Sequence, residues 1–113
     1  MTELTVEFTD EGDQLVLSLT GELDIDSVGE LREQAQQHLA DGRCRALTLD
    51  LSGLTFLDSS GLGLLLELRR LALSSQVTFA MMNVPAGPAR VIAIAGLTET
   101  FGLPAPDGGA AGS

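Results

Sequence analysis

The segment Leu49–Leu66, LDLSGLTFLDSSGLGLLL, decides the fold of this chain. It begins inside the apolar run Ala46–Leu51, which contains one Asp and is typical of a strand covered on both faces in a parallel sheet. A short crossing follows, and then an apolar stretch with helical spacing. Asp58 is a favourable N-cap residue for that stretch. The segment therefore predicts a buried strand, a crossing and a helix that begins at Ser59.

The two serines after Asp58 are the first chemically informative feature. With Asp58 as N-cap, Ser59 and Ser60 become the first two helical residues. Backbone N–H groups are unpaired at a helix N-terminus, and the helix dipole favours negative charge there. An exposed hydroxyl held at this position is well placed to carry a phosphate. The pair indicates a phosphorylation switch, although serine is also an ordinary capping residue at helix starts.

The rest of the chain alternates strands and helices. Leu4–Phe8 and Gln14–Thr20 alternate apolar and polar residues around the turn 9–13, which predicts a β-hairpin. Further helices are expected from Asp26 or Ser27 to about Ala40, from Ser59 to about Leu73 and through Val91–Ile94, with another strand at Gln76–Met82 and one more turn at Leu97–Phe101. Parallel pairs need right-handed crossovers, so this order predicts an α/β fold with a four-stranded mixed β-sheet, helices mainly on one face and a fairly open second face.

Length and charge narrow the class of protein. The 113 residues carry a net charge of −10, and nucleic acid and anionic lipid both require a basic surface. We therefore expect no nucleic-acid and no membrane partner, and a monomer in the cytoplasm, since the sequence has no signal peptide and a single cysteine. Residues 1–103 are expected to form one domain. Residues 104–113, PAPDGGAAGS, have no apolar periodicity and are expected to be a disordered tail.

The sequence lacks the patterns of the common catalytic sites. A serine nucleophile needs a base held by an orienting group, yet the chain has one histidine, and Leu57 stands where a nucleophile elbow has its first glycine. No His/Cys cluster suggests a metal site, and a phosphate-binding loop is missing because the chain contains no lysine. We expect a binding protein without a cofactor.

Three segments make the chain resemble the STAS domains of anti-sigma factor antagonists. They are Gly21–Asp24 (GELD), Asp58–Gly63 (DSSGLG) and Val91–Phe101 (VIAIAGLTETF). The likeness extends over about residues 2–102, and the serine motif with its preceding strand is its most specific part. In that family the serine directly after the aspartate is phosphorylated by a partner protein. The resemblance places that serine at Ser59.

The resemblance also implies partners and a mechanism. The unphosphorylated antagonist binds an anti-sigma factor, which is also an ATP-dependent serine kinase, and so frees the sigma factor. Phosphorylation ends the binding, and a serine phosphatase resets the antagonist. The implied partner-binding residues are Asp24, Asp58, Ser60, Gly61, Leu62 and Gly63. Two other functions stay open: a stand-alone STAS subunit of a lipid-transport or stress-sensing complex, and an antagonist whose kinase acts outside sigma control.

The sequence leaves the roles of three of these residues open. Gly61 and Gly63 each cost about 1 kcal/mol relative to alanine inside a helix. Either the close approach of a partner backbone or tight packing of the helix on the sheet would explain them. Asp24 is either part of the partner surface or only a turn or capping acid before the first helix.

Overall fold

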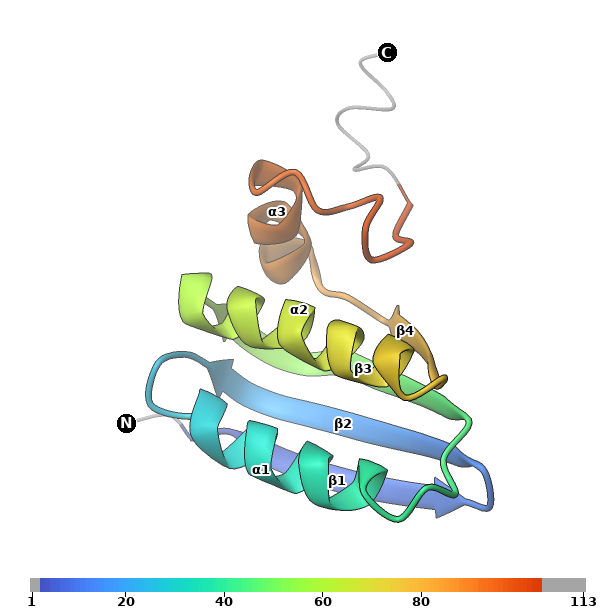
Figure 1. The fold of residues 1–113 in the computed structure, drawn as a ribbon. Coiled ribbons are helices and arrows are strands. Elements are labelled where there is room, and N and C mark those ends of the chain that lie inside the picture. Colours follow the sequence, from blue (N-terminus) through green and yellow to red (C-terminus); the bar gives the residue numbers. More distant parts are fainter. Residues whose placement is uncertain (1–2, 105–113) are drawn as a thin grey trace.

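The computed structural model describes residues 3–104, so most of the expected tail at 104–113 lies outside it (Figure 1). In this range the elements are β1 Thr5–Glu11, β2 Gln14–Leu23, α1 Val28–Leu39, β3 Ala46–Leu57, α2 Ser59–Ser74, β4 Thr78–Met82 and α3 Ala86–Ile94. The strands lie in the order β1-β2-β3-β4, with β1 antiparallel to β2 and the other two pairs parallel. The predicted four-stranded mixed sheet is confirmed.

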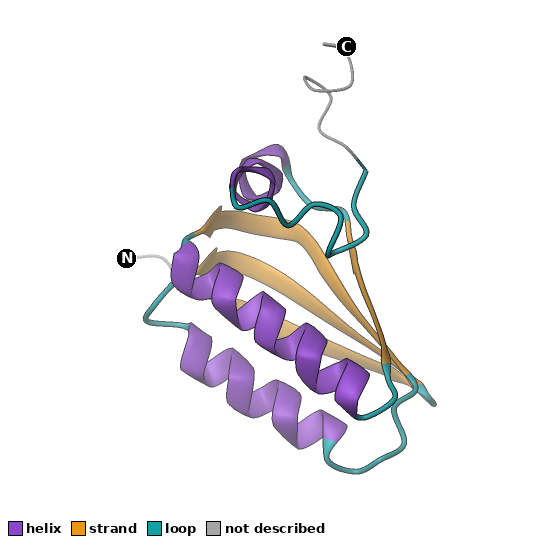
Figure 2. Cartoon of the chain, turned by 45° about the horizontal axis from the view of Figure 1, so that its top comes forward, coloured by secondary structure: helices purple, strands orange, loops and turns teal. Residues whose placement is uncertain are grey.

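The helices cover one face of the sheet. Helices α1 and α2 lie side by side in front of the strands (Figure 2). On the covered face of β3, Leu47, Leu49 and Leu51 are exposed by 1% or less, whereas the alternate residues, such as Thr48 and Asp50, are only half-buried. The expectation that this strand is covered on both faces is therefore wrong. Its sequence already alternates leucine with other residues, which is the pattern of a strand buried on one side.

Strand β3 is longer than predicted and is distorted. It continues past Leu51 to Leu57, so the expected crossing at 52–57 is wrong. Its register against β2 shifts twice, and each shift adds one residue to β3. Buried side chains consequently stand three residues apart at Leu51, Leu54 and Leu57, where a regular strand would bury every second one. The bulges broke the alternation by which the strand would have been recognised.

The hairpin is tighter than predicted. Strand β1 runs to Glu11 and β2 begins at Gln14, which leaves Gly12 and Asp13 as a two-residue turn in place of 9–13. Gly12 has φ of +78°, a conformation that suits glycine and two-residue hairpin turns. Strand β2 also extends beyond Thr20, so the GELD segment lies at the end of the strand.

The C-terminal elements lie closer to the ranges predicted from the sequence. Strand β4 begins at Thr78 and not at Gln76, because Gln76 has φ of +62° and ends the turn after α2. Helix α3 begins directly after Pro85, and the expected additional turn is present, since the Phe101 N–H donates to the Leu97 carbonyl at 3.1 Å.

Leucine dominates the core under the helices, supplying 14 of its 20 buried hydrophobic residues. Leu17, Leu49, Leu64 and Leu65 are among its fully buried members, and Ile92 of α3 joins the same cluster. Within residues 3–104 no polar or charged residue is classed as buried. None of the helices described is both long and apolar enough to cross a membrane.

An ion pair connects α1 to α2 at the surface. Arg32 Nε donates to Glu67 Oε2 at 2.7 Å, and Arg32 Nη2 donates to Glu67 Oε1 at 3.0 Å, so the contact is bidentate. The hydrogen bonds from Arg32 hold the pKa of Glu67 below its ordinary value of 4.5. Both side chains remain well exposed, so water screens the pair.

We expect Glu67→Gln to lower the melting temperature slightly at neutral pH. A carboxyl whose pKa is lower in the folded state stabilises the fold above its unfolded pKa, and this contribution is lost as the pH falls through the folded value. The difference between wild type and Glu67→Gln should therefore shrink as the pH drops below 4.5. Circular dichroism melts across this range test it. Glu33→Gln, at an exposed position of α1, is the control, and an equal difference at every pH would contradict the expectation.

Candidate functional site

The candidate site lies where β2 and β3 end side by side. Their parallel pairing sets Leu23 opposite Leu57, and the Asp58 N–H donates to the Leu23 carbonyl at 3.3 Å. Asp24, which follows Leu23, therefore lies next to the start of α2. The structure thus brings together the two segments, GELD and DSSGLG, that the sequence analysis singled out separately.

Asp58 caps α2 as predicted. Its backbone is extended, with φ of −107° and ψ of −174°, and its Oδ1 accepts a hydrogen bond from the Gly61 N–H at 2.9 Å. Ser59 is consequently the first helical residue and Ser60 the second. Ser59 is exposed, whereas Ser60 is half-buried. Within residues 3–104 neither hydroxyl has a hydrogen-bond partner, so the cap itself does not use them.

The two glycines of the motif differ in their surroundings. Gly61 is buried, and a Cβ there would overlap the Leu23 carbonyl oxygen and come within 2.8 Å of Leu57 Cδ1. Packing of the helix start on the end of β2 therefore explains Gly61. Gly63 is exposed, and a Cβ there would meet nothing within 4 Å, so packing does not explain it. Leu62 is buried in the core.

Asp24 organises the turn before α1. Its Oδ1 accepts the Asp26 N–H at 3.0 Å, and its carbonyl accepts the Val28 N–H at 3.1 Å. Ser27 occupies the cap position of α1, but its hydroxyl accepts the Asp24 N–H and donates to the Glu22 carbonyl, both at 3.0 Å, and binds no helical N–H. A turn role for Asp24 is thus shown. A role in binding a partner stays a prediction.

The surface beside Asp24 is strongly acidic. A groove of about 540 Å³ is lined by seven residues, five of them acidic: Glu3, Leu4, Glu22, Asp24, Asp26, Ser27 and Glu30. No basic side chain is among them. Across residues 3–104 no group of three or more His, Cys, Asp or Glu side chains is arranged to hold a metal ion. The groove therefore offers negative charge to a partner.

The sequence analysis did not identify two exposed apolar residues of this region. Ile25, next to Asp24, is 68% exposed, and Phe56, next to Leu57, is 47% exposed. Phe56 stands opposite Glu22 in the β2–β3 register. Large exposed apolar side chains beside polar ones are typical of protein interfaces. An isoleucine between two aspartates was the available signal for Ile25, whereas Phe56 fell within the expected crossing and had no such signal.

We expect Gly61→Ala to destabilise the protein and Gly63→Ala to leave it unchanged or more stable. The added methyl at Gly61 has no room beside Leu23, whereas at Gly63 alanine gains roughly 0.4–1 kcal/mol from its higher helix propensity. Urea unfolding of both variants, followed by circular dichroism, gives the two free energies of unfolding. Equal stability of the two variants would show that the contact at Gly61 is not tight.

The comparisons with known proteins agree with this geometry. A family model described as "Mlab, STAS domain" matches residues 6–104. The structure of an anti-sigma factor antagonist from Mycobacterium paratuberculosis is 28% identical in sequence, with a TM-score of 0.78 over 97% of this chain and 92% of that chain.

Two structures of SpoIIAA share the fold. The anti-sigma factor antagonist SpoIIAA in its unphosphorylated form is 24% identical, with a TM-score of 0.74 over 96% of this chain and 92% of that chain. The Bacillus cell fate determinant SpoIIAA in the phosphorylated form is also 24% identical, with a TM-score of 0.69 over 96% of both chains. Together with the family match over residues 6–104, these findings show that the chain belongs to the STAS domain family.

Proposed function

We propose that this protein is an anti-sigma factor antagonist and that phosphorylation of Ser59 switches its binding off. The observation that carries the proposal is the exposed Ser59 hydroxyl, held at the capped start of α2 beside Asp24. The 28% identity to an anti-sigma factor antagonist over nearly the whole chain supports the assignment of the partner class. The proposed partners are a kinase-type anti-sigma factor and a serine phosphatase.

Exposure and position favour Ser59 over Ser60 as the acceptor. A kinase must reach the hydroxyl from solvent, and Ser59 is the exposed member of the pair. Ser60 is half-buried at the second helical position, closer to the packed contact of Gly61 with the end of β2. We therefore assign Ser60 to the partner-binding surface and not to the modification.

Electrostatics explains how a phosphate would end binding without unfolding the protein. Phosphoserine adds about −1.5 to −2 charge at pH 7. At a helix N-terminus this stabilises the isolated fold by roughly 0.3–1 kcal/mol. In an interface the same group would have to lose water next to Asp58 and Asp24, and such like-charge contacts cost on the order of several kcal/mol. Each 1.4 kcal/mol lowers the affinity about tenfold, so a cost of this size would be enough to release the anti-sigma factor.

The unphosphorylated surface combines acidic and apolar groups. Asp24 and Asp58 supply charge, Ile25 and Phe56 supply exposed apolar area, and Gly63 leaves room for a partner backbone. Gly61 and Leu62 are buried, so they act by setting the position of the helix start. The complementary surface of the anti-sigma factor should offer apolar pockets and a basic group that pairs with Asp24, but no further basic group opposite Ser59 that could pair with a phosphate. We further propose that the protein acts as a monomer in the cytoplasm, without nucleic acid, membrane or cofactor.

We expect Ser59→Ala to abolish phosphorylation and to keep binding to the anti-sigma factor, because only the acceptor oxygen is lost. Ser60→Ala should still be phosphorylated. Ser59→Asp should bind more weakly than wild type, although one carboxylate carries less charge than a phosphate. Incubation of each variant with the kinase and ATP, followed by mass spectrometry and calorimetric titration, measures both properties.

Two results would contradict the assignment. One is phosphate found on Ser60 alone, and the other is a phosphorylated protein that binds as tightly as the unmodified one. Recovery of transporter subunits or a large stress-sensing assembly in a pull-down, with no kinase-type anti-sigma factor, would instead favour the stand-alone STAS subunit.

We expect Asp24→Asn to weaken binding of the anti-sigma factor by about tenfold while the fold is kept. The amide oxygen can still accept the Asp26 N–H, so the turn survives and only the charge is removed. Asp24→Ala loses the turn as well and should also lower the melting temperature. Asp13→Asn, in the hairpin turn at the far end of β2, is the matched control. Wild-type affinity in Asp24→Asn would exclude the Asp24 charge from the interface.

A further inference from the structure

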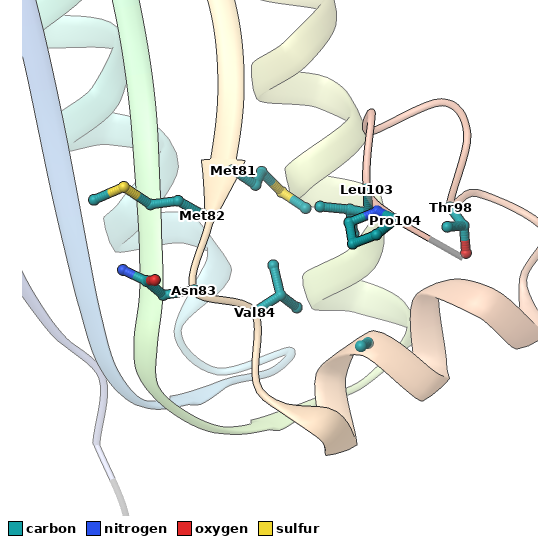
Figure 3. A pocket seen from close by; sticks show the side chains of 8 residues that line it. Met81, Met82, Asn83, Val84, Thr98, Leu103 and Pro104 are labelled. Atoms are coloured by element: carbon teal, nitrogen blue, oxygen red, sulfur yellow. The ribbon is translucent and has the colours of Figure 1, made fainter. Parts of the chain in front are cut away.

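A pocket of about 300 Å³ opens at the end of β4 and shares no residue with the site around Ser59 (Figure 3). Its walls come from three parts of the chain: the end of β4 with the loop after it, helix α3, and the segment after α3. Met81 and Val84 belong to the first part, Ala89 to the second, and Thr98, Leu103 and Pro104 to the third. The sequence analysis assigned no function to these residues.

The lining is apolar and uncharged. The side chains of Met81, Val84 and Leu103 point toward one another across the pocket (Figure 3). The eight lining residues include no charged side chain, and the amide of Asn83 is turned to Asp50, with Nδ2 at 3.2 Å from Oδ1. The hydroxyl of Thr98 is the one alcohol group among them. Within residues 3–104 it has no hydrogen-bond partner.

The wall after α3 is held in place by its own contacts. The Phe101 N–H donates to the Leu97 carbonyl at 3.1 Å, and the Leu103 N–H donates to the Thr98 carbonyl at 3.0 Å. The Phe101 side chain is 6% exposed and packs against Phe79, with ring centroids 6.3 Å apart. The pocket is thus formed by anchored segments, as is usual for ligand sites.

We propose that this pocket binds an uncharged amphiphile with an unbranched chain of about eight carbons and a hydroxyl head group. Its volume is twice that of the roughly 150 Å³ apolar cavity that accepts benzene. The flexible Met81 side chain adapts to a chain, and Thr98 supplies one hydrogen bond to the head. A charged head would lose water without gaining a charged partner.

The test uses the full chain labelled with ¹³C at the methionine methyl groups. The Met81 signal is assigned from the spectrum of Met81→Leu. We expect 1-octanol to shift this signal saturably and octanoate to bind at least about tenfold more weakly, because its carboxylate must lose water. No shift, a shift that never saturates, or equal binding of both probes would overturn the proposal.

Two substitutions locate the binding. Ala89→Leu fills the pocket and should abolish the saturable shift, whereas Ala86→Leu, on the same helix but exposed and outside the lining, should leave it unchanged. Thr98→Val keeps the shape of the side chain and removes its hydroxyl. This variant should bind 1-octanol about two- to tenfold more weakly. Wild-type affinity in folded Ala89→Leu overturns the proposal. If circular dichroism shows that variant unfolded, Thr98→Val decides instead, and unchanged affinity overturns it.

Discussion

The parallel ladder between β2 and β3 is the interaction on which the rest of the structure depends. It continues to Leu23 and Leu57 through two shifts of register, at each of which β3 contains one extra residue. After these shifts β2 and β3 end opposite each other, and the start of α2 lies beside the turn before α1. The ladder thus determines both the buried face beneath the helices and the contact of the Asp58 N–H with the Leu23 carbonyl at the end of the two strands.

The residues that stabilise the fold and those of the proposed phosphorylation site are separate in this molecule. The core consists mostly of leucine on one face of the sheet, and the charged side chains of residues 3–104 all lie at the surface. The start of α2 obtains its capping hydrogen bond from Asp58, so this cap does not use the hydroxyl of Ser59. A negative group added there acts on whatever approaches the acidic surface and leaves the leucine core untouched. Such separation allows a modification to alter affinity while the fold persists.

Local patterns in the sequence predicted the features that depend on neighbouring residues. The cap at Asp58, the helix from Ser59 and the sheet with helices on one face followed from capping preference and periodicity. The bulges in β3 could not be predicted, because they appear only in the pairing with β2 and break the alternation that marks a strand. Likewise, the packing role of Gly61 and the exposure of Phe56 depend on β2, which is distant in the sequence.

The close packing of Gly61 against the end of β2 has a consequence for how a kinase would recognise Ser59. Because the helix start contacts the Leu23 backbone, and Asp24 follows Leu23 directly, the helix start and the acidic turn lie packed side by side. Many phosphorylation sites lie in flexible segments that must be ordered when a kinase binds, and that ordering lowers affinity. The proposed acceptor, Ser59, stands at a helix start whose cap is already formed, so a kinase that binds there would have less of the chain to order. Such a kinase would have to match the shape of this packed surface, so its selectivity would depend on surface complementarity.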